Sequence, residues 1–297
     1  MAGIERRGAL LVFGSAAVWS FGGAIARYLS VTDSWTAIFW RSVCAALFLL
    51  GFMLWREGGA GTVRLFRAMG WAGVGVGLCF ATASTCFVVA LGYTTVANIL
   101  LMQAGAPLFA ALAGAVLFRE RIGVPTWLAI VAVILGVGIM VSNSIAGRVS
   151  PVGDGLALLM SVAVAGATVL TRRHANVGMM PAVFLGTVIA ATVGGVMAGQ
   201  WQVSAADAGL LFVFGALNLG LGMALFVTGV RLLPAALAAL IGTFEPVLGP
   251  VWVWLVHGEV PGQRTLIGGA VVILALVLHL AWQFRQNNPA AAVPLMD

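Results

Sequence analysis

Residues 96–120 read VANILLMQAGAPLFAALAGAVLFRE, and residues 235–259 read AALAALIGTFEPVLGPVWVWLVHGE. Each stretch is apolar, long enough to cross a bilayer, and interrupted near its middle by a proline, Pro107 in the first and Pro246 in the second. Proline removes a backbone hydrogen bond and clashes with the carbonyl group four residues earlier, so we expect both helices to kink there. The two stretches lie 139 residues apart and indicate an internal repeat.

The same offset superposes further residues, among them Phe87 on Phe226, Ala97 on Ala236 and Glu120 on Glu259. An offset of 146 superposes the first apolar run on the sixth and brings Arg27 onto Arg173, the difference being a loop insertion. Each half then holds five helices. Because five is odd, the second half must be inverted in the membrane relative to the first. Inverted repeats are typical of secondary transporters, whose substrate site lies near the midplane where the repeats meet.

The composition indicates a membrane protein, because 62% of the residues are hydrophobic and only 8% are charged, against roughly 25% charged in soluble domains. We expect an all-α membrane protein of ten transmembrane helices, built as two inverted five-helix repeats around a central cavity. The first repeat spans residues 1–147, the second 148–286, and 287–297 form a disordered tail. The expected spans are 8–27, 35–55, 68–91, 95–118, 125–142, 153–171, 181–199, 206–230, 235–256 and 265–284.

All fifteen basic residues are arginine, and the net charge is +6. They are scattered over short loops and form no stripe, which excludes a nucleic-acid partner. With the N-terminus inside, eleven arginines fall on the inner side and three on the outer side, namely Arg27, Arg148 and Arg264. This bias predicts that both termini are cytoplasmic. The three cysteines lie within apolar runs without metal-ligand spacing, so we expect neither a disulfide framework nor a metal or cofactor.

Two charged residues lie within spans, where an ionised side chain costs at least about 2.5–3.5 kcal/mol and needs a partner. Glu245 precedes Pro246 near the centre of its span. It either binds a proton or a substrate ammonium group, or bonds to the backbone that the proline frees. Three roles are open to Arg41: snorkelling to the surface, pairing with an acidic side chain, or binding a substrate carboxylate.

Neutral polar side chains in spans are more often hydrogen-bonding partners between helices than ligands. Aromatic and methionine side chains beside them would suit a flat apolar substrate. We expect the pocket to be lined by Arg41 and Glu245 together with Trp19, Phe80, Ser84, Asn98, Met102, Gln103, Asn218, Met223 and Phe244. Pro107 and Pro246 are the expected hinges.

These motifs, in this order, resemble the drug/metabolite transporter superfamily of the EamA type. The resemblance covers residues 8–284 and rests on Ala106-Pro107 with Arg119-Glu120-Arg121, on Glu245-Pro246-Val247 with Gly258-Glu259, and on Phe39-Trp40-Arg41-Ser42. Within that family the chain is most similar to bacterial YddG-type exporters, which release aromatic amino acids. The resemblance implies a basket of ten helices in a bacterial inner membrane that exports metabolites or amino acids.

We therefore expect a secondary transporter that exports small metabolites, with amino acids and especially aromatic ones favoured, by alternating access. Its partners would be the substrate and the lipid bilayer, and it would act as a monomer. The alternative is a broad drug/metabolite efflux carrier or a facilitative, channel-like permease. An enzyme is not expected, because the sequence has no H-E-x-x-H motif, no G-x-S-x-G elbow and no pair of intramembrane aspartates.

Overall fold

The computed structural model describes residues 2–119, 123–145, 150–174, 179–233 and 235–287. Glu120, Arg121, Arg148 and the expected tail after residue 287 lie outside these ranges, as does the expected boundary between the repeats. Every regular element within them is helical. The elements are α1 Ala2–Ser20, α2 Gly22–Tyr28, α3 Ser34–Ala90, α4 Val96–Gln103, α5 Ala106–Phe118, α6 Val124–Ile145, α7 Pro151–Arg173, α8 Met179–Met197, α9 Ala205–Phe212, η1 Val213–Leu221, α10 Gly222–Val230, α11 Ala235–Gly242, α12 Phe244–His257 and α13 Gln263–Asn287.

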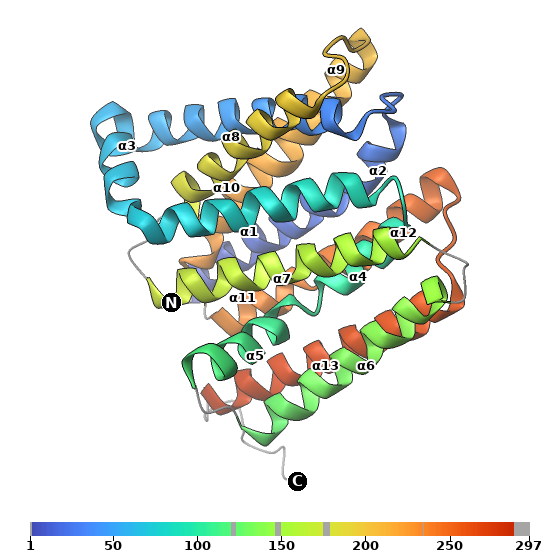
Figure 1. The fold of residues 1–297 in the computed structure, drawn as a ribbon. Coiled ribbons are helices and arrows are strands. Elements are labelled where there is room, and N and C mark those ends of the chain that lie inside the picture. The colour runs from blue at the N-terminus through green and yellow to red at the C-terminus, as the bar shows by residue number, and fades with distance from the viewer. Residues whose placement is uncertain (1, 120–122, 146–149, 175–178, 234, 288–297) are drawn as a thin grey trace.

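The helices run side by side in one bundle (Figure 1). The start of α1 and the end of α13 lie at the same end of this bundle, which we call the terminal face. The connections 29–33, 91–95, 198–204 and 258–262 lie at the opposite end, the distal face.

Helix α3 crosses the membrane twice. Unbroken, its 57 residues would measure about 85 Å, nearly three times the hydrocarbon thickness. The backbone leaves helical geometry at Gly58 (φ 69°, ψ 174°) and Gly70 (φ 55°, ψ −166°), and the chain turns back there at the terminal face (Figure 1). Nine helical segments among the described residues are apolar and long enough to cross a membrane, α3 being one of them. With α3 counted as two limbs, the ten expected spans are confirmed.

Replacing Gly58 with alanine is expected to destabilise the protein by about 1–3 kcal/mol, because its backbone conformation is essentially restricted to glycine. No neighbouring atom would crowd the added methyl group, so the cost comes from backbone strain alone. Gly59→Ala is the matched control, since Gly59 is also uncrowded but has no positive φ. Thermal unfolding in detergent measures the difference. Equal midpoints for the two variants would contradict the account.

The two halves pack according to the inverted repeat. Helix α1 packs against α10 and α12, and α7 packs against α3 and α5. The offsets of 146 and 139 residues relate α1 to α7, the second limb of α3 to α10, and α5 to α12, so the same contacts occur twice. Helices α6 and α13, the last span of each half, pack against one another.

The helix breaks near the two prolines occur at equivalent positions. Helix α4 ends at Gln103 and α11 ends at Gly242, 139 residues later. The following helices, α5 and α12, each end in a left-handed residue, Arg119 (φ 55°) and Gly258 (φ 67°). These residues are also 139 apart. The repeat is therefore present in the backbone conformation as well as in the order of the helices.

Candidate functional site

Span 1 is broken between α1 and α2 at Phe21, although it contains no proline. The Asn218 side-chain amide donates a hydrogen bond to the Val18 carbonyl oxygen at 2.5 Å. The Trp252 indole N–H donates to the Ser20 hydroxyl oxygen at 2.9 Å. Asn218 and Trp252 both come from the second half of the chain, so that half supplies the polar groups that accompany a break in the first.

Asn218 lies in η1, a π-helical segment of span 8. π-Helices are rare and occur frequently at functional sites. Gly215 of the same segment lies so close to the backbone carbonyl of Arg41 that a side chain there would collide with it. η1 therefore contacts both the break in span 1 and the backbone of Arg41.

The guanidinium group of Arg41 is buried, with the residue only 5% exposed. One terminal nitrogen donates to the Ser84 hydroxyl oxygen at 2.8 Å. The central carbon lies 4.2 Å from the ring centre of Phe214 and 5.8 Å from that of Phe87, within the range of cation–π attraction. The Nε–H has no partner, and no acidic group of the described residues lies within ion-pair distance. Arg41 therefore neither snorkels nor pairs with a described carboxylate.

Trp19, Phe80 and Met223 gather in what we call the aromatic–methionine cluster. Its other members include Leu49, Met53, Met180, Val183, Phe184, Phe226 and Val227. The ring centres of Trp19 and Phe226 are 5.4 Å apart, and the Trp19 indole N–H is buried without a partner. Such a lining is large, apolar and adaptable.

A small cleft of about 40 Å³ opens onto this cluster from the terminal face, between α3, α8 and α10. Met53, Met180 and Val227 belong to both the cleft and the cluster. The cleft is lined by Phe52, Met53, Arg56, Glu57, Leu65, Met179, Met180, Pro181, Val227 and Arg231.

Glu245 lies in the first turn of α12, directly after the break in span 9. The N-terminal end of a helix stabilises a negative charge, so the break gives this carboxylate a favourable position inside the membrane. Among the described residues it has no hydrogen-bond or ion-pair partner. Phe244 is 46% exposed and packs edge-on against Phe13. The side-chain oxygen of Gln103, at the equivalent break, is buried without a partner.

Asn98 and Met102 are already engaged in packing. The Asn98 amide donates to the Thr94 hydroxyl oxygen and to the Asp154 carboxylate, which ties span 4 to span 6. Met102 is fully buried in the largest core cluster. The structure thus gathers Trp19, Phe80 and Met223 in one cluster and joins Arg41 to Ser84. The expected pocket residues of spans 4 and 9 lie outside that cluster. Roles in substrate binding remain predictions for all of them.

A model of the EamA-like transporter family matches this chain twice, over residues 6–142 and 151–281. No curated protein matches it. One solved crystal structure, described only as that of a protein, superposes with a TM-score of 0.64 at 18% identity, covering 94% of this chain and 98% of its own. That likeness shows the fold alone. Because the family model covers both halves of the molecule, the chain belongs to the EamA-like transporter family, whose members carry small molecules across membranes.

Proposed function

We propose that this protein is a secondary transporter that exports small metabolites, above all amino acids with aromatic side chains, by alternating access. Family membership supports a membrane transporter of small molecules. The substrate class, the direction and the mechanism are our proposal. It acts as a monomer in a bacterial inner membrane, with the terminal face toward the cytoplasm, as the eleven-to-three distribution of arginine favours.

The observation that carries the proposal is the buried cation at Arg41 beside the aromatic–methionine cluster. Arg41 bonds to Ser84, and Ser84 lies one helical turn from Phe80, a member of the cluster. Residues four apart lie on one face of a helix, so the hydroxyl that binds the cation lies on the helix face that also carries Phe80. An aromatic amino acid carries a carboxylate that a guanidinium can bind through two parallel hydrogen bonds. It also carries a flat ring that aromatic side chains and methionine can cover.

The breaks in spans 4 and 9 are the proposed hinges of the conformational change. Spans 4 and 9 break at equivalent positions, Gln103 and Gly242, and discontinuous helices of this kind form the substrate and ion sites of many secondary transporters. In our proposal the two halves rock about these breaks, with Pro107 and Pro246 as hinges. Glu245 binds the substrate ammonium group or a coupling proton from its place at the start of α12.

Flux measurements in proteoliposomes test the function. Saturable flux of radiolabelled phenylalanine is expected, with competition by tryptophan and none by threonine or a dicationic drug. Competition by the dication without competition by tryptophan would favour a broad efflux carrier. Flux without saturation would favour a channel-like permease.

Glu245→Gln is expected to abolish substrate flux driven by a pH gradient and to retain substrate counterflow. An unchanged pH dependence of flux would show that Glu245 does not carry the coupling proton.

A further inference from the structure

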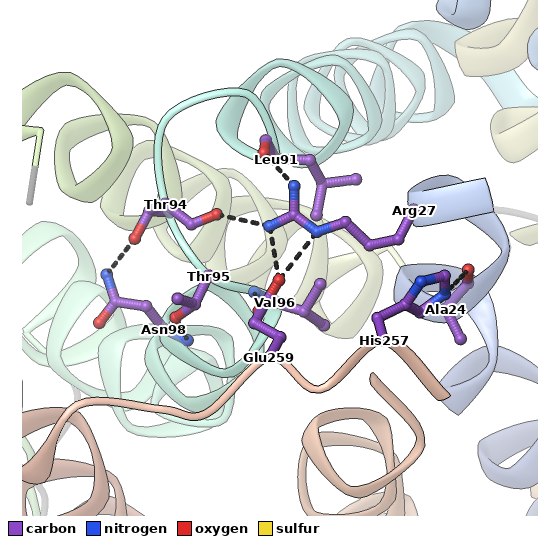
Figure 2. Close-up of polar contacts among 9 residues, drawn as sticks. All are labelled: Ala24, Arg27, Leu91, Thr94, Thr95, Val96, Asn98, His257 and Glu259. Atoms are coloured by element: carbon purple, nitrogen blue, oxygen red, sulfur yellow. Dashed lines mark hydrogen bonds and ion pairs between the residues drawn. The ribbon is translucent and has the colours of Figure 1, made fainter. Parts of the chain in front are cut away.

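Arg27, at the distal end of span 1, joins three segments of the chain (Figure 2). Its Nε and Nη2 atoms lie 2.9 Å and 2.8 Å from one carboxylate oxygen of Glu259. Its Nη1 and Nη2 groups also donate to the carbonyl oxygens of Leu91 at 2.7 Å and Thr94 at 3.0 Å, respectively. Arg27 therefore fixes the connection between spans 3 and 4 to the connection between spans 9 and 10.

Glu259 links the two halves at this corner through both of its carboxylate oxygens. Its second carboxylate oxygen accepts a hydrogen bond from the Val96 backbone N–H at 2.7 Å, at the start of α4. The carboxylate thus accepts hydrogen bonds from two N–H groups of the first half, those of Arg27 Nε and Val96, while Glu259 itself belongs to the second half. The left-handed residue Gly258 ends α12 directly before it and turns the chain toward Arg27. Hydrogen bonds to a charged acceptor are roughly twice as strong as neutral ones.

Neighbouring contacts also join the two halves at the distal face. A ring nitrogen of His257 lies 3.0 Å from the Ala24 carbonyl oxygen, and the His257 ring packs edge-on against Tyr28. Across another part of the distal face, the Gly199 N–H donates to the Asp33 carboxylate at 3.1 Å. Burial opposes ionisation of Asp33, but hydrogen bonds from the Thr36 hydroxyl and from the Trp35 and Gly199 amides outweigh it and hold the pKa of Asp33 below its ordinary value.

We propose that the Arg27–Glu259 pair is a gate that closes the distal face between the two halves. The inference rests on the alternating-access function proposed above, because only a carrier that opens toward the distal face needs to break a polar contact between its halves there. The side chains of Arg27 and Glu259 are 29% and 19% exposed, so water reaches the pair. Water can therefore solvate both charges when they separate, which makes the contact reversible.

The pair differs from the ion pair of Arg56 with Glu57. The Arg56 Nε atom lies 3.4 Å from a carboxylate oxygen of Glu57. Because the two residues are consecutive in α3, that pair cannot hold the halves together. Neutralising Glu57, whose side chain is 36% exposed, therefore removes a carboxylate without touching the contact between the halves. Glu57→Gln is the matched control for Glu259→Gln.

The test measures opening of the distal face without any transported substrate. A reporter, Ala97→Cys, is placed directly behind the Val96 contact, where Ala97 is 1% exposed. The native cysteines Cys44, Cys79 and Cys86 are replaced by alanine in the same full-length protein. Reaction of the reporter with a water-soluble maleimide is then followed in detergent. Glu259→Gln is expected to raise the reaction rate about tenfold or more, because it removes charge-assisted hydrogen bonds.

Arg27→Gln, which breaks the pair from the first half, is expected to give a similar increase, whereas Glu57→Gln leaves the rate unchanged. Arg27→Gln also serves if Glu259→Gln does not elute as a monodisperse protein on gel filtration. A rate for either gate variant equal to that of Glu57→Gln would overturn the gate. Because no transported molecule takes part, failure of amino acid export in the flux assay and failure of the gate are separate results.

Discussion

Gly136→Val is expected to lower the thermal unfolding midpoint of the detergent-solubilised protein, whereas Gly138→Val leaves it nearly unchanged. Gly136 lies where α6 crosses α13, and a Cβ added there would lie 2.7 Å from the Gly268 carbonyl oxygen and 2.8 Å from a methyl carbon of Val272. In return, a Cβ added at Gly268 would lie even closer to the Gly136 carbonyl oxygen. The two backbones are therefore in direct contact, and small residues at such crossings let membrane helices approach closely.

The expected cost of Gly136→Val is about 3 kcal/mol, the upper end of the range for overpacking, because a backbone carbonyl group cannot rotate away as a side chain can. Gly138 is two residues further along the same helix and has no atom within 4 Å of an added Cβ. The same substitution there should change stability by less than about 0.5 kcal/mol. Equal unfolding midpoints for the two variants would show that the α6–α13 contact does not limit stability.

Arg41→Ala is expected to reduce kcat/KM for phenylalanine by about 10–100-fold, which is the loss expected for charge-assisted hydrogen bonds to a carboxylate. Phenethylamine, which has the same ring and amine but no carboxylate, should inhibit the variant and the unsubstituted protein equally. Flux and competition in proteoliposomes measure both quantities. Arg41→Lys keeps the positive charge but lacks the planar pair of donors, so an intermediate loss is expected.

The comparison between the amino acid and the amine separates recognition from structure. Arg41 also bonds to Ser84 and packs against Phe214, so its removal could disturb spans 2, 3 and 8 without any effect on recognition. In that case phenylalanine transport and phenethylamine inhibition would fall together. That result would remove Arg41 from the substrate site and leave it as a packing residue.

The features that were predictable from the sequence arise from local chemistry. The breaks in spans 4 and 9 follow from Pro107 and Pro246, because proline acts on its own helix whatever surrounds it. The ten spans follow from the lengths of the apolar runs. The double crossing of α3 agrees with the expected spans 35–55 and 68–91. Gly58 breaks the helix within the short polar connection between these spans, and Gly70 breaks it near the start of the second span.

The features that were not predictable depend on residues far apart in the chain. No proline marks the break in span 1, and Asn218 contacts it from 200 residues away. The π-helical segment η1 has no local signal either, and it packs against the backbone of Arg41. Arg27 was predictable only as a charge that orients the membrane protein, whereas the structure pairs it with Glu259 across 232 residues.

The sequence indicated which types of residue the candidate site contains better than it indicated how those residues are arranged. A helix that is apolar all round gives no indication of which face points inward. Trp19, Phe80 and Met223 do share one cluster, but Asn98 is bonded to Thr94 and Asp154. These contacts and hydrogen bonds depend on how each helix is rotated about its own axis, and a single sequence does not determine that rotation.

The break in span 1 also means that the first five helices are not a self-sufficient unit. The Val18 carbonyl and the Ser20 hydroxyl groups meet side chains that residues 148–286 supply. A separately produced N-terminal fragment would lack these partners, and an unsatisfied backbone group in lipid costs several kcal/mol. The ribosome synthesises Asn218 and Trp252 after span 1, so these two hydrogen bonds can form only once most of the second half has been made.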